Sequence, residues 1–369
     1  MSMVEWKKIE EVCTVLTGGD APRECAKGQL EPTMENPYPI YSNGDETYGF
    51  CSTYRVNTDA VTISSIGNVG SVFYRTANFT PIIRLKVVIP STKLLSTKFL
   101  YYSLLDYSFV GTNSSLSSMK AADIKRIKIP IPSLSEQTRI VGILDTFTSA
   151  IDNLKEQIAQ RRKQYEYYRD QLLDLEGKPR VEMKFITEVA KSFTGLTYKP
   201  ENVSDSGTLV LRSSNINDDV LSFDDNIFVQ MVIPERAKVQ ENDILICVRN
   251  GSKRLVGKSA MITKEAEGMA FGAFMTILRS FAINSKFLFY VWQSEKVRRQ
   301  YKGDEAMPIA QITAKDFQRI VIPVPSLSEQ KRIVSILDTF EASIQNLEAQ
   351  LKEREKQYEY YRNKLLTFE

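Results

Sequence analysis

The chain contains a long segment that occurs twice. Residues 129–176 align without a gap to residues 322–369, and 31 of the 48 aligned positions are identical. A shorter similarity relates residues 4–12 to residues 181–189. Both signals keep their order along the chain, which indicates two halves of the same plan. We therefore predict four parts, namely a first module (1–128), a first helix segment (129–180), a second module (181–321) and a second helix segment (322–369).

Each repeated segment begins with a signal for the start of a helix. The leading Ile-Pro-Ile-Pro or Ile-Pro-Val-Pro cannot lie inside a helix, because proline lacks the backbone donor and biases its predecessor toward extended geometry. Ser133 with Glu136, and Ser326 with Glu329, then fit the capping box, in which a hydroxyl and a carboxylate satisfy free N–H groups of the first turn. We expect a long helix to begin at each serine.

Apolar residues follow at heptad spacing over five heptads, from 140 to 175 and again from 333 to 368. This spacing is typical of a coiled coil, and the seam would span about 50 Å at 1.5 Å per residue. The first helix leaves the first module and reaches the second, whereas the second helix only leaves the second, so pairing within the chain must be antiparallel. Arg161 and Arg354 interrupt the seam, where we expect them to set the register or to extend to the surface.

The repeated helices also share their outward faces. Residues 163–169 and 356–362 are identical at seam and non-seam positions alike, although a seam explains only the tyrosines that lie on it. Two equal surfaces suggest two copies of one partner, and a recent duplication is the alternative. The candidate partner-binding residues are Gln164, Tyr167, Gln357 and Tyr360.

The modules, in contrast, barely align in their interiors. This difference indicates a constraint that keeps the sequences of the helix segments similar and allows those of the modules to diverge. The alternative is that sequence divergence is less visible in helices than in loops. Both modules are rich in short β-prone runs, and each has a late helix-like stretch at 97–102 or 285–290. The predicted strands are 60–63, 71–74 and 82–85 in the first module, and 243–248 and 275–278 in the second.

The predicted fold class is therefore α+β, with two globular modules separated by two long helices that form an antiparallel coiled coil in a pseudo-twofold arrangement.

Composition excludes much catalytic chemistry. The chain has no histidine, which removes imidazole as a general base, as the partner of a nucleophile and as a metal ligand. Its four cysteines form no C-x-x-C pair, so we expect buried thiols and no zinc site. The stretch 251–259 has one residue too many between its glycines for a phosphate-binding loop, and 36–38 lacks the second proline of the tetrapeptide of adenine methyltransferases. We expect no catalytic residue.

No apolar run approaches the length of about 18 residues that a membrane helix needs, and the first residues lack the apolar core of a signal peptide. We therefore expect a cytoplasmic protein without a membrane partner.

The net charge of +3 is small, but the second module contains two cationic clusters. Such clusters suit phosphate contacts, and Arg or Asn can also recognise base edges. A solvated charged surface is the alternative. The first cluster contains Arg249, Lys253, Arg254 and Lys258, and the second contains Lys296, Arg298, Arg299 and Lys302 beside Tyr301.

Two dissimilar modules, each followed by I-P-[IV]-P-S-L-S-E-Q and a long heptad helix, resemble the specificity (S) subunit of type I restriction-modification enzymes. The resemblance covers the whole chain. It implies that the modules are target recognition domains, which each recognise one half of a bipartite, asymmetric site on double-stranded DNA, and that the helices are spacers. It also implies that two methyltransferase (M) subunits and the restriction (R) subunits are partners. S-adenosylmethionine, ATP and magnesium would then be bound by those partners and no cofactor by this chain.

Further fragments similar to the family are 41–44 and 66–71 in the first module, and 212–216 and 248–251 in the second. The first module departs from the family pattern, because no arginine precedes the glycine of 66–71. The candidate DNA-contacting residues are Asn43, Asn68, Arg75, Arg249, Asn250, Lys253, Arg254, Lys258, Arg298 and Arg299.

A separation of about 50 Å corresponds to roughly one and a half turns of DNA, so both modules could contact one duplex. The alternative function is a coiled-coil scaffold with two protein-binding modules and no DNA role. A nuclease or methylase activity of the chain itself is disfavoured by the missing motifs. Steeply salt-dependent DNA binding would separate DNA recognition from the scaffold.

Overall fold

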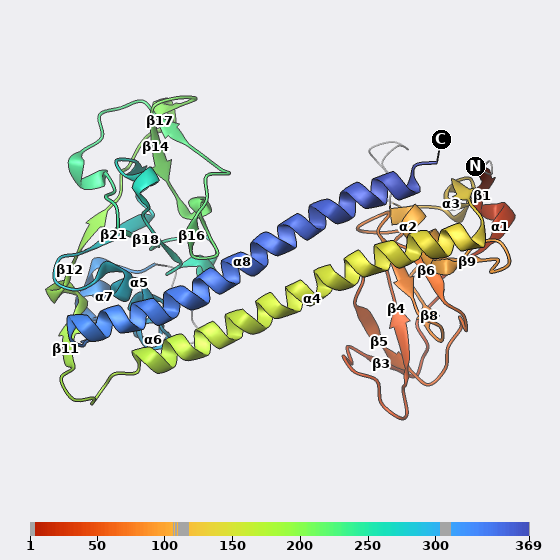
Figure 1. Ribbon diagram of the computed structural model, residues 1–369, viewed down its shortest axis with the longest axis horizontal. Helices are drawn as coiled ribbons and strands as arrows, with labels where there is room; N and C mark the ends of the chain where they lie inside the picture. Colours follow the sequence, from red (N-terminus) through yellow and green to blue (C-terminus); the bar gives the residue numbers. More distant parts are fainter. Residues whose placement is uncertain (1–3, 106, 108, 110–117, 303–310, 369) are drawn as a thin grey trace. The chain divides into compact units, whose positions relative to one another are not determined.

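The computed structural model describes residues 4–105, 107, 109, 118–302 and 311–368 (Figure 1). The chain divides into unit 1, made of Met1–Lys155 and Ala349–Glu369, and unit 2, made of Glu156–Glu348. Each unit thus combines one module with the first half of one long helix and the second half of the other. The four-part division along the sequence stays a prediction.

The two long helices begin where the sequence predicts. Helix α4 (Leu134–Leu173) starts directly after Ser133, whose Oγ accepts the N–H of Glu136 at 3.3 Å. The hydroxyl contact of the predicted capping box is therefore present. The Glu136 carboxylate forms a bidentate pair with Arg139, at 2.6 and 2.8 Å. Helix α8 (Leu327–Leu366) repeats all of these contacts with the equivalent residues.

The two helices lie side by side within each unit (Figure 1), and side-chain contacts fix their direction. Residue numbers in α8 fall as those in α4 rise, which confirms the predicted antiparallel pairing in both units. The contacts are Phe147 with Tyr361 and Lys155 with Glu355 in unit 1, and Arg162 with Glu348 and Tyr168 with Phe340 in unit 2.

The described part of unit 1 holds two four-stranded sheets and one two-stranded sheet. The first sheet has the order β2 (Cys13–Thr17), β9 (Lys86–Pro90), β6 (Ala60–Ile63), β7 (Val72–Arg75) and is antiparallel. The second has the order β3 (Cys25–Lys27), β5 (Thr47–Cys51), β4 (Tyr38–Tyr41), β8 (Thr80–Pro81). The short helices are α1 (Ile9–Val12), α2 (Thr97–Leu105) and α3 (Ala121–Lys125).

Unit 2 follows the same plan. Its antiparallel sheet has the order β12 (Ala190–Thr194), β21 (Met275–Ser280), β18 (Ile244–Cys247), β19 (Ser259–Met261). The second sheet has the order β13 (Val203–Ser204), β17 (Phe228–Val229), β14 (Thr208–Leu211), β20 (Ala270–Phe271), and β15 (Ile216–Asn217) pairs with β16 (Val220–Leu221). The short helices are α5 (Ser285–Gln293), α6 (Glu295–Lys302) and α7 (Ala314–Arg319). Modules whose sequences barely align therefore share one topology, and the α+β class is confirmed.

The two repeat signals of each half meet in space. Strand β1 (Glu5–Lys8), from the short similarity, pairs antiparallel with β10 (Lys128–Ile131), which contains the Ile-Pro-Ile-Pro run. In unit 2, β11 (Glu182–Phe185) pairs in the same way with β22 (Val321–Val324). A two-stranded sheet tolerates these prolines, because a proline that lacks a donor is accepted on an edge strand. The start of each module is thereby fixed to the start of its helix.

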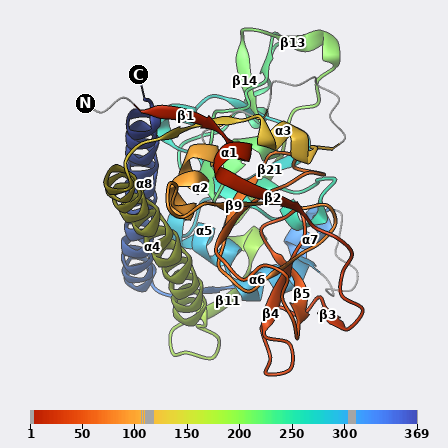
Figure 2. The same ribbon diagram turned by 90° about the vertical axis from the view of Figure 1, so that its right-hand side faces the viewer.

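The modules and the helices share hydrophobic cores. In unit 1, Ile140 and Leu144 of α4 and Leu366 of α8 are buried in the same cluster as Phe99 of α2. Figure 2 faces this unit and shows α2 between the two long helices and the sheet that contains β2 and β9. In unit 2, α8 and α4 likewise bury residues in one cluster with Trp292 of α5. A module without its helix ends would lose part of its core.

A buried glutamine joins each helix to its module. Gln137 donates from Nε2 to the carbonyls of Leu94 (2.8 Å) and Pro132 (2.9 Å), and its Oε1 accepts the N–H of Ser96 at 2.9 Å. Gln330 repeats two of these contacts in unit 2, with the carbonyl of Pro325 and the N–H of Asn284. The Gln of the repeated motif therefore positions the start of α2 or α5 against the long helix.

We expect Gln137→Leu to destabilise unit 1 by about 1–3 kcal/mol, because the substitution leaves buried backbone groups unpaired. Chemical unfolding measured at several denaturant concentrations would give the free energy. Thr138→Ala, at the exposed neighbouring position, serves as the matched control and should stay within about 0.5 kcal/mol of the parent. Equal stability of both variants would contradict this role of Gln137.

A second link uses the same three residue types in each unit. The Asp145 carboxylate of α4 accepts the hydroxyl of Tyr102 at 2.7 Å and pairs with Lys98 at 2.5 Å. In unit 2, Asp338 of α8 does the same with Tyr290 and Lys286. No sequence pattern predicts this triad, because the carboxylate and its partners lie in different segments of the chain.

Most predicted elements of the modules are present, and one is wrong. The runs 60–63, 71–74, 243–248 and 275–278 contain or overlap β6, β7, β18 and β21, and the helix-like stretches lie within α2 and α5. The predicted strand 82–85 is instead a turn, in which Ile83 and Arg84 have φ angles of 50° and 59°. The apolar run misled the prediction because Ile82 and Leu85 are buried on either side of the turn.

Candidate nucleic-acid interface

The loop after β18 presents an exposed cationic surface in unit 2. Arg249, Lys253 and Arg254 are all exposed, and Lys253 and Arg254 lie in a single 3-10 turn, Lys253–Leu255. No ion pair among the described residues involves these three side chains. Cations without acidic partners are available for phosphate groups.

Arg249 also stacks on an aromatic ring. Its guanidinium carbon lies 5.2 Å from the ring centre of Phe274, which is 57% exposed. The carbonyl of Phe274 accepts the N–H groups of Val248 (3.0 Å) and Arg249 (3.2 Å), so the turn that carries the ring is fixed to the loop. A planar cation held on a ring can offer its fork of donors to a base edge or a phosphate. The clustering of cations in the sequence indicates Arg249 but gives no signal for Phe274.

Asn250 and Lys258 are directed into the protein. Asn250 donates to Ser213 Oγ at 3.0 Å, and its Oδ1 accepts the N–H of Ser252 at 2.9 Å. Lys258 Nζ donates to the carbonyl of Ile216 at 2.8 Å. These contacts bring together the two family-like fragments of the second module, 212–216 and 248–251. The geometry gives Asn250 and Lys258 the role of shaping the loop.

The second cationic cluster lies on α6 and faces acids. This pairing leaves less positive potential for a ligand than the loop after β18 has. Burial raises the pKa of Asp219, and the positive charge of Arg298 opposes that rise. The side chain of Lys302 lies outside the described part of the chain. The opposed charges are Lys296 with Glu176, Arg299 with Glu295, and Arg298 with Asp219.

In unit 1, Arg75 is buried, with 6% of its surface exposed. Its guanidinium lies 3.9 Å from the ring centre of Tyr41, pairs with Asp45 at 3.1 Å and donates to the carbonyl of Gly44 at 2.8 Å. Burial lowers its pKa, although the charge of Asp45 opposes this. Arg75 thus supports the family-like fragment 41–44 from beneath, and its contact with DNA stays a prediction.

Asn43 and Asn68 differ in their availability. Asn43 is half-buried, donates to the carbonyl of Ile83 at 2.7 Å and accepts the N–H of Ser65 at 2.7 Å. Its amide is therefore engaged on both sides within unit 1. Asn68 is exposed in the loop between β6 and β7, where Gly67 and Gly70 have positive φ angles. Of these two asparagines, Asn68 is the one placed where DNA could reach it.

The outward faces of the long helices carry exposed tyrosines in both units. Tyr167 is 61% exposed and Tyr360 is 59% exposed. In unit 1, Tyr360 and Gln357 border an open groove of about 510 Å³ beside the stacked pair of Phe147 and Tyr361. The equivalent stacked pair in unit 2 is Tyr168 with Phe340.

The seam arginines extend along these faces. Arg161 donates to Gln164 at 3.2 Å, and Arg354 donates to Gln357 at 3.0 Å. The guanidinium of Arg354 also lies 5.7 Å from the ring centre of Phe147. Both arginines therefore reach from the seam to the predicted partner-binding glutamines, as expected for side chains that extend to the surface.

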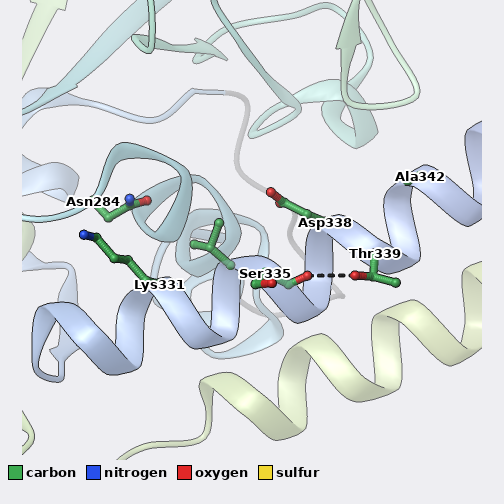
Figure 3. A pocket seen from close by; sticks show the side chains of 7 residues that line it. Asn284, Lys331, Ser335, Asp338, Thr339 and Ala342 are labelled. Carbon is green, nitrogen blue, oxygen red and sulfur yellow. Dashed lines mark hydrogen bonds between the residues drawn. The ribbon is translucent and has the colours of Figure 1, made fainter.

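A second open groove, of about 490 Å³, lies along α8 in unit 2. Figure 3 shows Lys331, Ser335 and Thr339 one after another along the helix, Asp338 projecting from another side of it, and Asn284 near Lys331 just before α5. Asp338 belongs to the triad that joins α5 to α8. The groove therefore follows the junction between the module and its helix.

Among the described residues, the other groups that could carry chemistry form no metal cluster and no disulfide. In the described ranges no three His, Cys, Asp or Glu side chains are grouped so that they could hold a metal ion. The four cysteines are free, with Cys51 and Cys247 buried and Cys13 and Cys25 half-buried. Burial raises the pKa of the Cys13 thiol to about 12, so the thiol stays protonated. In the part of the chain that the structure describes, no helix has the length and apolar character of a membrane span.

Residues 1–161 and 180–355 match the family described as the type I restriction modification DNA specificity domain. A type I restriction enzyme specificity subunit of Escherichia coli is 32% identical over 293 residues, which cover 72% of this chain and 71% of that protein. A putative type I specificity subunit of Mycoplasma pneumoniae is 25% identical over 98% of this chain and 97% of its own length.

Solved structures share the fold. The S subunit of a type I restriction-modification system from M. genitalium has a TM-score of 0.62 at 17% identity, over 100% of this chain and 97% of that one. A chain from a study of the assembly and conformational transition of the type I system has a TM-score of 0.60 at 17% identity, over 99% and 97%.

Proposed function

The chain belongs to the type I restriction-modification DNA specificity family, and we propose that it recognises a bipartite, asymmetric site on double-stranded DNA, one half with each module. The observation that carries the proposal is the loop after β18, where exposed Arg249, Lys253 and Arg254 lie beside the exposed ring of Phe274. Lys253 and Arg254 there suit phosphate groups, and the stacked Arg249 suits a base edge.

As a specificity subunit the chain is a non-catalytic component of its complex, and chemistry comes from partners. Two M subunits dock on the outward faces of the long helices, one on the face of Gln164 and Tyr167 and one on that of Gln357 and Tyr360. Supporting this, each face combines an exposed tyrosine with a glutamine held by a seam arginine. The M subunits bring S-adenosylmethionine, and the R subunits bring ATP- and magnesium-dependent translocation and cleavage.

Salt dependence tests the DNA face of unit 2. We expect Lys253→Ala to weaken binding to all duplexes alike and to lower the slope of log K against log salt by about one unit, as the loss of one phosphate contact does. Arg249→Ala should instead cost about 1–3 kcal/mol, mainly on the cognate site. Binding is measured on the complex with its M subunits, using a random-sequence duplex and a duplex that carries the methylated motif.

Lys264→Ala is the matched control, since Lys264 is an exposed cation of the same module that pairs with Glu267. It should leave the salt slope unchanged. Unaltered affinity and slope in both Lys253→Ala and Arg254→Ala would place the DNA face elsewhere. A wild-type complex whose DNA binding does not respond to salt would favour the scaffold without a DNA role.

A further inference from the structure

The turn between β8 and β9 in unit 1 is strained and exposed. Ile83 and Arg84 both have left-handed backbone angles, with φ of 50° and 59°. This region is unfavourable for most residues other than glycine, asparagine and aspartate, and most of all for a β-branched one. Ile83 is nonetheless 47% exposed and Arg84 is exposed, so burial of these two side chains does not explain the conformation.

The surrounding backbone holds the turn in place. The N–H of Ile83 donates to the carbonyl of Gly19 at 2.8 Å, and the N–H of Arg84 donates to that of Gly18 at 3.1 Å. Gly18 permits this approach, because a Cβ there would lie 2.9 Å from backbone atoms of Ile82. Both donors of the strained residues are therefore satisfied by a glycine pair at the end of β2.

Two side chains donate hydrogen bonds to the backbone carbonyls of the same turn. Asn43 Nδ2 donates to the carbonyl of Ile83 at 2.7 Å, and Ser65 Oγ donates to the carbonyl of Arg84 at 2.8 Å. Asn43 and Ser65 are themselves joined, since Asn43 Oδ1 accepts the Ser65 N–H. Strained residues persist only where the surrounding structure determines them, and they concentrate at functional sites. Four hydrogen bonds here fix how Ile83 and Arg84 are presented.

Unit 2 has a turn at the same place in the topology. It lies between β20 and β21 and carries Phe274, just as the strained turn lies between β8 and β9. The bridge of Leu196 with Gly272 repeats that of Gly19 with Ile82, and Gly195 abuts the backbone at Gly272 as Gly18 does at Ile82. The strained turn of unit 1 is thus the counterpart of the turn that stacks on Arg249.

In each unit one exposed arginine and one exposed apolar side chain lie on the loop and the turn, but the two units place them on opposite elements. In unit 2 the loop after β18 supplies Arg249 and the turn supplies the apolar Phe274. In unit 1 the loop after β6 supplies the exposed, apolar Ile66, and the turn supplies Arg84. The hydrogen bond from Ser65 to Arg84 places that loop and turn side by side. No ion pair among the described residues occupies Arg84.

We propose that Arg84 is the base-contacting arginine of the first module and takes the place of the arginine that its loop lacks, with Ile83 as its apolar neighbour on the DNA. This inference rests on the proposed function. Arginine recognises guanine through two parallel hydrogen bonds to O6 and N7. A rigid turn suits this contact, because less freedom is lost when the side chain binds. Asn43 and Ser65 are then positioning residues.

The test compares Arg84→Ala with Arg84→Lys in the complex with its M subunits. Methylated motifs are sequenced in the host, and binding is measured by selection from a pool of random-sequence duplexes. We expect Arg84→Ala to lower the preference at one position of one half-site by about 5- to 150-fold and to leave the other half-site unchanged. Arg84→Lys should restore affinity but only part of this preference, because the lysine ammonium can donate to guanine but lacks the planar fork. Arg249→Ala, the counterpart in unit 2, should change only the other half-site.

A second variant keeps the test decisive if Arg84→Ala folds poorly. Ile83→Gly removes the strain, so we expect a higher Tm together with a broader preference in the same half-site as Arg84→Ala. Unchanged half-sites in Arg84→Ala, or in a folded Ile83→Gly, would overturn the inference while DNA recognition by the chain stands. A wild-type complex that selects no sequence from the pool would instead overturn the proposed function.

Discussion

A chain in which residues 181–321 also replace residues 1–128 is expected to lose one half of its target and to recognise the other half twice. The physical reason is that, in the proposed function, the module loops make the base contacts, as the loop of Arg249 is proposed to do, whereas the long helices α4 and α8 connect the modules. With the pseudo-twofold arrangement predicted from the repeats, the new site is an inverted repeat of the second half-site. The recognised sequence therefore changes completely at one half-site and stays the same at the other.

The contacts at the junction explain why such a chain should fold. The inserted copy brings Lys286 and Tyr290, which pair with Asp338 as Lys98 and Tyr102 pair with Asp145. It also brings Asn284, whose N–H is the partner of Gln330 as that of Ser96 is of Gln137. Asp145 on α4 thus meets a lysine and a tyrosine as it does now, and Gln137 meets a backbone N–H at the equivalent position.

Methylome sequencing in a host that carries the M subunits measures the outcome. The reciprocal chain, with two first modules, is the control and should recognise the first half-site twice. A chain that kept the parental motif, or one in which both halves changed to new sequences, would show that the modules do not recognise DNA independently. If a chain gives no methylation at all, comparing its unfolding with that of the parent shows whether it is misfolded or is folded but inactive.

The features that sequence predicts best are those set by local chemistry. The start of α4 follows from Ser133 and the prolines before it, and the antiparallel pairing follows from the heptad spacing and the order of the segments. These signals lie within a few residues of the element that they determine. Each of these signals occurs twice in the chain, once in each half, so a chance match to the pattern is excluded.

Long-range contacts decide what the sequence could not. Arg75 stands in an alternating strand like any exposed cation, and only the fold shows that Tyr41 and Asp45 enclose it. The apolar residues around Ile83 predict a strand. The left-handed backbone of the turn depends instead on Asn43, which lies 40 residues earlier.

The candidate DNA face was half predictable for the same reason. Clustering of cations identified Arg249, Lys253 and Arg254, which are exposed, but it also selected Lys258, whose Nζ donates to a carbonyl. The sequence of the loop alone does not predict which of its side chains point into the protein. Phe274 was missed because a phenylalanine beside the apolar residues of a strand gives no signal of exposure, whereas the fold places it beside Arg249.

Lengthening both helices by one heptad is expected to widen the non-specific gap in the target without changing either half-site. Seven residues add about 10 Å of helix, which corresponds to about three base pairs at 3.4 Å each. The insertions belong after Ile158 in α4 and after Leu351 in α8. These positions leave Lys155 with Glu355 in unit 1 and Arg162 with Glu348 in unit 2, so each unit keeps its own cross-helix pair.

The added base pairs also rotate the duplex by about 100°, taking roughly 10.5 base pairs per turn. We therefore expect slower methylation together with the longer gap, measured by methylome sequencing and by binding to duplexes of stepped spacing. A heptad in α4 alone is the control, since its two cross-helix pairs cannot then both form in register, and it should lose site-specific binding. An active double-insertion variant with the parental gap would show that the helices do not set the spacing.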